Sequence, residues 1–193
     1  MLCVFGYSQQ NGNEALKSLS QNIKSHKNIA IDFKYHLEGE AALNGKSQQG
    51  QGWLQGEAYK VVVEDQQTIC DGSTIWNYLI EDEEVMVSSA SDGEDNTPIK
   101  LFTSLDKDYQ AKIVNCDAKG ITTLELFSDK KDIRKIVLKV DLSKKSIKEA
   151  RIYTDDTPVI IEITKMSYDQ ELSKDFFLFD EAKHPGVEVI DMR

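Results

Sequence analysis

The alternation of apolar and polar side chains from Ile29 to Leu37 constrains the fold of this chain more than any other sequence feature. Isoleucine, phenylalanine, tyrosine and leucine occupy every second position, and alanine, aspartate, lysine and histidine lie between them. Because successive side chains of a β-strand point to opposite faces, this period predicts a strand with one face in the core and one in water. Short apolar runs continue to Tyr168, and turn sequences such as Asp71-Gly72 separate them. The pattern predicts a mainly β protein built on a long antiparallel sheet.

Two helical segments interrupt the strands. Apolar side chains recur at helical spacing in residues 13–27, and Thr97-Pro98 has the cap and first-turn proline of a second, shorter helix. A long antiparallel sheet with so few helices must curl or be plugged to cover its apolar face, which favours a sandwich, a barrel or a half-barrel. Besides residues 29–37, we expect strands at residues 59–64, 67–71, 74–80, 84–88, 109–115, 122–127, 135–140, 146–154 and 159–168.

The length and net charge of the chain limit the classes of protein to which it can belong. Its 193 residues suit one domain, and no segment is long and apolar enough to span a bilayer. The net charge of −10 argues against binding to nucleic acid or to anionic lipid headgroups, because it would repel both. We expect residues 1–10 to be a signal-peptide remnant or a disordered N-terminus, with a frayed, partly buried start as the alternative. Residues 11–193 are expected to form a single domain.

The sequence contains no recognisable catalytic or metal-binding pattern. None of its three histidines stands at metal-ligand spacing from another histidine or a cysteine, and no serine lies in a Gly-x-Ser-x-Gly motif. Cys70 and Cys116 lack a nucleophile signature, and they either pair in an oxidising compartment or remain thiols. We therefore expect no enzymatic activity, no cofactor and no metal.

What remains is an apolar, aromatic-rich sheet face that the second helix would cover. A packed core is the ordinary interpretation of such a face, and a cavity that admits an acyl chain is the alternative. Each buried methylene contributes about 0.8 kcal/mol, so acyl chains would bind such a cavity without any charged group. The candidate cavity residues are Phe33, Tyr35, Trp53, Tyr59, Val61, Val63, Trp76, Tyr78, Val85, Val87, Ile99, Phe102 and Leu105.

Four stretches of the chain stand in a distinctive order. Residues 50–54 read Gly-Gln-Gly-Trp-Leu, residues 71–78 read Asp-Gly-Ser-Thr-Ile-Trp-Asn-Tyr, and residues 96–99 read Asn-Thr-Pro-Ile. Residues 176–191 begin with Phe-Phe-Leu-Phe-Asp and end with Pro-Gly-Val-Glu-Val-Ile-Asp. In this order they resemble the motifs of the LolA family of periplasmic outer-membrane lipoprotein carrier proteins.

The resemblance implies an incomplete, curled antiparallel β-barrel, a half-barrel whose few helices form a lid over a hydrophobic cavity. It implies a periplasmic chaperone that receives acylated lipoproteins from an inner-membrane ABC transporter and hands them to an acceptor at the outer membrane, without catalysis or cofactor. We expect a monomer. The alternative is a periplasmic sensor or regulatory module that binds a lipid or a protein on the same half-barrel.

One position departs from the family pattern. In the best-known members an arginine follows the Gly-x-Leu strand and helps to hold the lid shut. Here Gly56 or Glu57 stands at that place, and Lys60 is the nearest cation. The role of the arginine is therefore not carried over to Lys60.

Overall fold

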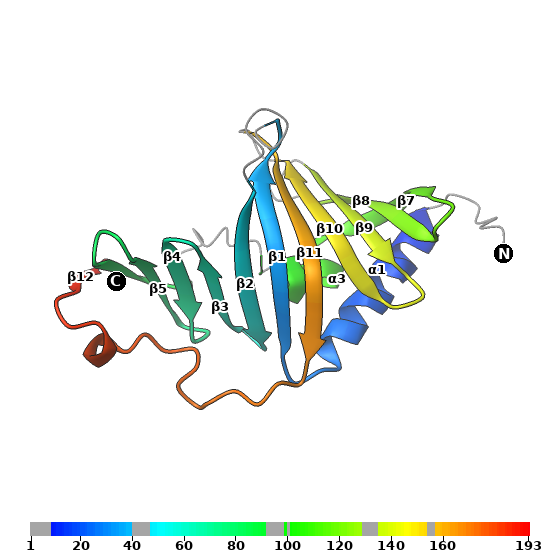
Figure 1. The fold of residues 1–193 in the computed structure, drawn as a ribbon. Helices are drawn as coiled ribbons and strands as arrows, with labels where there is room; N and C mark the ends of the chain where they lie inside the picture. The colour runs from blue at the N-terminus through cyan, green and yellow to red at the C-terminus, as the bar shows by residue number, and fades with distance from the viewer. Residues whose placement is uncertain (1–8, 40–46, 92–98, 100, 129–134, 154–156) are drawn as a thin grey trace.

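The computed structural model describes residues 9–39, 47–91, 99, 101–128, 135–153 and 157–193. Within them, twelve strands form one open, curled sheet, and two α-helices, α1 (Gln9–Lys24) and α3 (Leu101–Asp108), pack against one side of it (Figure 1). We call this side the inner face and the opposite side the outer face. The protein is therefore mainly β, as the residue pattern predicts, and has the half-barrel architecture that the family resemblance implies.

The sheet has the strand order β12-β6-β5-β4-β3-β2-β1-β11-β10-β9-β8-β7. Neighbouring strands run antiparallel, except that β12 lies parallel to β6. The pairing of β1 with β11 joins the first half of the chain to the second. The strands are β1 (Ile29–Leu37), β2 (Gln48–Gln55), β3 (Ala58–Val63), β4 (Gln66–Cys70), β5 (Thr74–Leu79), β6 (Glu84–Ser89), β7 (Gln110–Cys116), β8 (Ile121–Phe127), β9 (Lys135–Asp141), β10 (Ser146–Tyr153), β11 (Val159–Tyr168) and β12 (Glu188–Asp191).

Every strand expected from the sequence is present, with ends that differ by at most one residue. The turn at Asp71 is also confirmed, because its carboxylate accepts hydrogen bonds from the backbone N–H groups of Ser73 and Thr74, each at 2.8 Å. The first helix begins and ends earlier than predicted, and the Thr97-Pro98 start of the second lies outside the described residues. Two strands were missed by the sequence pattern: β2, whose composition is mostly glutamine and glycine, and the four-residue β12 at the edge of the sheet.

The helix α1 lies along β7 and closes one end of the inner face. Leu16, Leu19 and Ile23 are buried in the core cluster. Gly12 allows the close approach, because a Cβ atom there would lie 2.3 Å from the carbonyl oxygen of Ala111 in β7. The Asn13 side chain accepts a hydrogen bond from the Ala111 N–H at 2.7 Å, which fixes the helix to the sheet.

Beyond β11 the chain crosses the outer face. Residues 169–187 pass β2 to β5 and lead into β12 at the edge of the sheet (Figure 1). Phe177 in this segment is buried, whereas all four residues of β12 are exposed. The C-terminal segment therefore covers the outer face of the same strands whose inner face turns toward α3.

The two described cysteines lie on different parts of the sheet. Cys70 ends β4 and Cys116 ends β7, with seven strands between them in the sheet order. Both are thiols in this structure. Of the two alternatives left open by the sequence, the structure therefore has the unbridged one.

Candidate binding cavity

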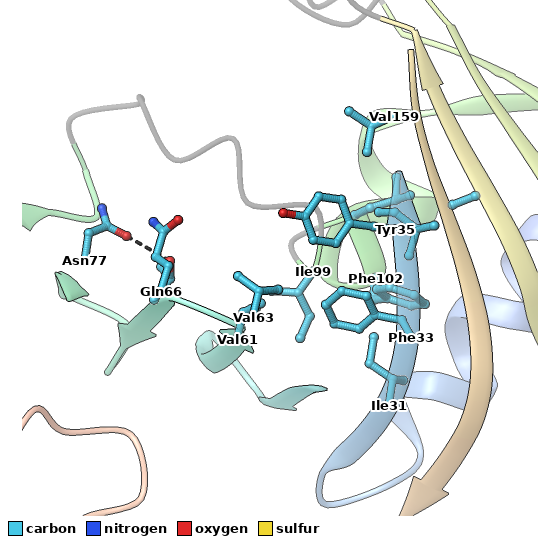
Figure 2. Close-up of a pocket in the computed structure, with 14 residues that line it drawn as sticks. Ile31, Phe33, Tyr35, Val61, Val63, Gln66, Asn77, Ile99, Phe102 and Val159 are labelled. Atoms are coloured by element: carbon cyan, nitrogen blue, oxygen red, sulfur yellow. Dashed lines mark hydrogen bonds between the residues drawn. The ribbon is translucent and has the colours of Figure 1, made fainter. Parts of the chain in front are cut away.

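A cavity of about 430 Å³ lies between the inner face and the segment that contains α3 (Figure 2). This volume is within the range of about 300–1,000 Å³ that is typical of ligand pockets. Ten of its described lining residues are aliphatic or phenylalanine, and four carry polar atoms. The lining consists of the apolar Ile31, Phe33, Val61, Val63, Ile99, Leu101, Phe102, Ala150, Val159 and Ile161 and the polar Tyr35, Gln66, Thr68 and Asn77.

The floor of the cavity comes from strands that are distant in sequence. Ile31, Phe33 and Tyr35 point inward from β1 because they occupy alternate positions. The register pairs Tyr35 with Ile161 of β11, so the inward residues of β11 continue the same apolar surface.

Two glycines of β2 make room for the cavity wall. A Cβ atom at Gly50 would lie 2.5 Å from Cζ of Phe33, and one at Gly52 would lie 2.8 Å from Cδ1 of Ile99. The ring of Phe33 therefore occupies the space over Gly50, and Ile99 rests on Gly52. The glycine-rich composition that hid this strand from sequence analysis is what allows the two lining side chains to sit there.

The helix α3 is attached to α1 through one carboxylate. Ser20 Oγ and Lys24 Nζ both donate hydrogen bonds to Asp106 Oδ1, at 2.7 and 2.5 Å. Partial burial tends to raise the pKa of Asp106, but the hydrogen bonds from Lys24 and Ser20 outweigh it and hold that pKa below its usual value. We call this contact the Asp106 latch. An eight-residue helix is marginal in isolation, so α3 depends on this latch and on the burial of Leu105.

Polar groups mark one side and the rim of the cavity. The Tyr35 hydroxyl donates a hydrogen bond to Gln48 Oε1 at the rim. Burial, together with the charges of Glu64 and Asp65, raises the pKa of Tyr35. On the other side, Thr68 Oγ1 donates to Asn77 Oδ1 at 2.9 Å.

The structure brings six of the thirteen candidate residues together at the cavity. They are Phe33, Tyr35, Val61, Val63, Ile99 and Phe102. Tyr59 and Leu105 are also on the inner side, but they are fully buried in the core cluster. The lining residues that were not predicted are Ile31, Gln66, Thr68, Asn77, Leu101, Ala150, Val159 and Ile161. Those of β10 and β11 were missed because the pairing of β1 with β11 is not a local feature, although the alternate positions Val159, Ile161 and Ile163 are all apolar.

The expectation that all candidates share one face is wrong for five of them. Val61 pairs with Thr68, which pairs with Asn77, so the inward residues of β5 are its odd-numbered ones. The five residues on the outer face are Trp53, Trp76, Tyr78, Val85 and Val87. Both faces of these strands are covered, so the alternation within each strand did not reveal which residues point inward.

The outward aromatic residues contact the C-terminal segment. Trp53 meets Phe176 edge to face with ring centroids 5.3 Å apart, and Tyr78 contacts Phe179 at 5.3 Å and His184 at 4.7 Å. Aromatic residues of the stretches 50–54 and 71–78 therefore pack against the stretch 176–191 outside the cavity. We call these residues the outer aromatic cluster.

Lys60 also belongs to the outer face. Its ammonium group lies 5.4 Å from the ring centroid of Phe176, and burial together with the charge of Lys183 lowers its pKa. Gly56 is in the turn after β2 with a φ of 61°, and Glu57 beside it is exposed. In this chain the Asp106 latch is one of the contacts that join α3 to α1.

Neither a metal-binding cluster nor a membrane-spanning helix is found among the described residues. They contain no cluster of three or more histidine, cysteine, aspartate or glutamate side chains suited to a metal ion. Within the same part of the chain, no helix has the length and apolar character required to traverse a membrane. The arrangement is suited to enclosing an apolar molecule.

Comparisons with known proteins agree with this fold. A protein named outer-membrane lipoprotein carrier protein from Pasteurella multocida (strain Pm70) is 27% identical over 188 residues, covering 93% of this chain and 88% of that protein. An uncharacterized conserved protein from Thermus thermophilus has a similar crystal structure, with a TM-score of 0.61 at 9% identity, covering 92% of this chain and 97% of that one. A putative outer membrane lipoprotein-sorting protein domain from Vibrio parahaemolyticus has a TM-score of 0.54 at 10% identity, covering 89% and 97% of the two chains.

The sequence also matches a protein family directly. The model of the family described as "Outer membrane lipoprotein carrier protein LolA" aligns with residues 64–180. The match covers more than half of the chain and includes the Asp-Gly turn, α3 and the first aromatic residues of the C-terminal segment. The chain therefore belongs to the LolA family of outer membrane lipoprotein carrier proteins.

Proposed function

We propose that this protein is a periplasmic chaperone that binds the acyl chains of lipoproteins beneath α3 and carries them from the inner to the outer membrane. The apolar cavity is the observation that carries the proposal. Its partners would be acylated lipoproteins, an inner-membrane ABC transporter that releases them and an acceptor at the outer membrane. Membership of the LolA family and the name of the Pasteurella relative, outer-membrane lipoprotein carrier protein, support this role.

The physical chemistry of the cavity suits an acyl cargo. Burial of roughly a dozen methylenes would contribute about 10 kcal/mol before the costs of ordering, at about 0.8 kcal/mol each. Phe102 of α3 forms part of the cavity wall, so a cargo larger than the present cavity requires α3 to move as it enters and leaves. The helix is held by one partly exposed latch and by apolar contacts, and an acyl chain can replace such apolar contacts during exchange.

A displacement assay tests the proposal. The neutral apolar dye N-phenyl-1-naphthylamine is bound to the purified protein and displaced with a synthetic lipopeptide that carries an acylated diacylglyceryl cysteine. We expect saturable displacement by the lipopeptide and none by the same peptide without acyl chains. Transfer of the lipopeptide from liposomes into the soluble fraction then tests the carrier role.

Two neighbouring valines provide a matched control. Val61 faces the cavity and Val62 faces outward, and both are half-buried on β3. A carboxylate in an apolar cavity is costly, so Val61→Asp should abolish lipopeptide binding while Val62→Asp retains it. Thermal unfolding first establishes that both variants fold. Absence of dye and lipopeptide binding by the wild-type protein would contradict the proposal and favour the alternative of a protein-binding module.

A further inference from the structure

The cavity has a polar side that a purely apolar ligand would leave unused. Gln66 and Thr68 of β4 and Asn77 of β5 line it next to the valines of β3. Figure 2 shows Asn77 and Gln66 at one side, Val61 and Val63 between, and Phe33 and Ile31 at the other side. The cavity therefore has a direction, from uncharged polar groups to an apolar end.

The hydrogen bond within this polar group leaves specific atoms for a ligand. Thr68 Oγ1 donates to Asn77 Oδ1, so the amide oxygen of Asn77 turns toward Thr68 and its two N–H donors turn away from it. Gln66 adds a second amide beside it. Amide N–H groups are suitable donors for the carbonyl oxygen of an ester or an amide.

The charge of the lining residues determines which polar groups of a ligand can lie at the polar side of the cavity. Among the lining residues that the structure describes, none is a lysine, an arginine or a histidine. Burial raises the pKa of Tyr35, and the negative charges of Glu64 and Asp65 raise it further, so the electrostatic potential at the cavity rim is negative. An ionised carboxylate or phosphate would be desolvated without a cationic partner, whereas a neutral carbonyl needs only a hydrogen-bond donor.

We propose that Gln66, Thr68 and Asn77 form a carbonyl-binding subsite for uncharged acyl esters and amides. The subsite orients the ligand with its ester or amide group at β4 and β5 and its chain beneath α3 against β1 and β11. It makes the cavity prefer neutral acyl esters to ionised fatty acids. This inference rests on the proposed acyl-binding function and adds its ligand class and orientation.

The test compares two neighbouring glutamines. Gln66 faces the cavity, and Gln67 faces outward at its pairing with Tyr78, so Gln66→Leu and Gln67→Leu differ mainly in the face they change. Monopalmitoylglycerol and palmitate at neutral pH compete with N-phenyl-1-naphthylamine for each protein. The dye has no carbonyl group, and its own affinity reports whether the apolar part of the cavity is intact.

We expect the wild-type protein to bind monopalmitoylglycerol more tightly than palmitate. Loss of one hydrogen bond to a neutral carbonyl corresponds to about a 2- to 12-fold weaker affinity, which we expect for Gln66→Leu and for Asn77→Leu. Dye affinity should not fall in either variant, because leucine adds apolar surface to the lining, and Gln67→Leu should behave as wild type throughout.

The possible failures are distinct. If the dye binds and both lipids displace it equally, or if Gln66→Leu and Asn77→Leu leave the ester preference unchanged, the subsite is refuted and the acyl-binding function stands. If the wild-type protein binds neither dye nor lipid, the proposed function fails and the subsite with it.

Discussion

The Asp106 latch predicts how readily the lid opens. Replacing Asp106 with alanine removes the hydrogen bonds that it accepts from Ser20 and Lys24 of α1. A partly exposed ion pair contributes about 0.2–1 kcal/mol, and a hydrogen bond about 0.5–1.5 kcal/mol. The two together amount to about 0.7–2.5 kcal/mol, which corresponds to an increase of about 3- to 60-fold in the open population.

Hydrogen exchange measures this opening locally. The amides of α3 should exchange faster by that factor in Asp106→Ala, and an acyl probe should associate faster if opening limits its entry. Asp169→Ala is the control, because the Asp169 carboxylate pairs with His26 Nδ1 and accepts a hydrogen bond from the Lys27 N–H, and neither residue belongs to α3. Unchanged exchange in α3, with a loss of global stability alone, would refute the idea that the latch breaks when the lid opens.

The pH dependence gives an independent check of the same latch. Hydrogen bonds from Lys24 and Ser20, acting against the effect of burial, lower the folded-state pKa of Asp106 below the ordinary 3.8. A carboxylate with a lowered pKa stabilises the fold fully above its unfolded-state pKa and loses that contribution as the pH falls through the folded value. Exchange of α3, corrected for intrinsic rates, should therefore be constant from neutral pH to about pH 5 and rise only below about pH 4. In Asp106→Ala this rise should disappear.

Three further substitutions test the packing. Gly12→Ala should lower the unfolding free energy in urea by about 1–2 kcal/mol, because the clash with the Ala111 backbone exceeds the helix-propensity gain of about 1 kcal/mol; a more stable variant would contradict this. Gly50→Ala should push the Phe33 ring toward the cavity and weaken lipopeptide affinity by at least about fivefold in the displacement assay, and unchanged affinity would show that the ring moves elsewhere. Phe177→Ala should lower the free energy of unfolding by about 3 kcal/mol, measured by thermal unfolding, and should leave dye binding intact below the melting temperature. Loss of dye binding in the folded variant would show that the outer and inner faces of the sheet are coupled.

The sequence was informative about the fold because the relevant signal is local. The alternation in β1 and the Asp71 turn each depend on a few neighbouring residues, and both appear in the structure as expected. The composition of β2 carries no such signal. This strand exists because β1 and β3 supply hydrogen-bonding partners on both sides, which is a property of the assembled sheet.

The candidate site was only partly predictable for a related reason. Period-two patterns assign residues of one strand to two faces, but a neighbouring strand must fix which face is inward. Where one face of a strand meets water, its polar residues identify the outward face, as Asp32 and Lys34 do in β1. In β5 the residues Trp76 and Tyr78 face the C-terminal segment and Asn77 faces the cavity, so the larger apolar side chains pointed to the wrong face.

The cavity is hollow because of side chains that are missing from the inner face. On the outer face, the outer aromatic cluster fills the space between the sheet and the C-terminal segment. On the inner face, Gly50 and Gly52 contribute no side chain to the middle of the sheet, and a helix of only eight residues lies over it. A hydrophobic pattern records which apolar groups are present and not the volume they leave open. The glycines of β2 are therefore the part of the sequence that distinguishes an open cavity from a filled core.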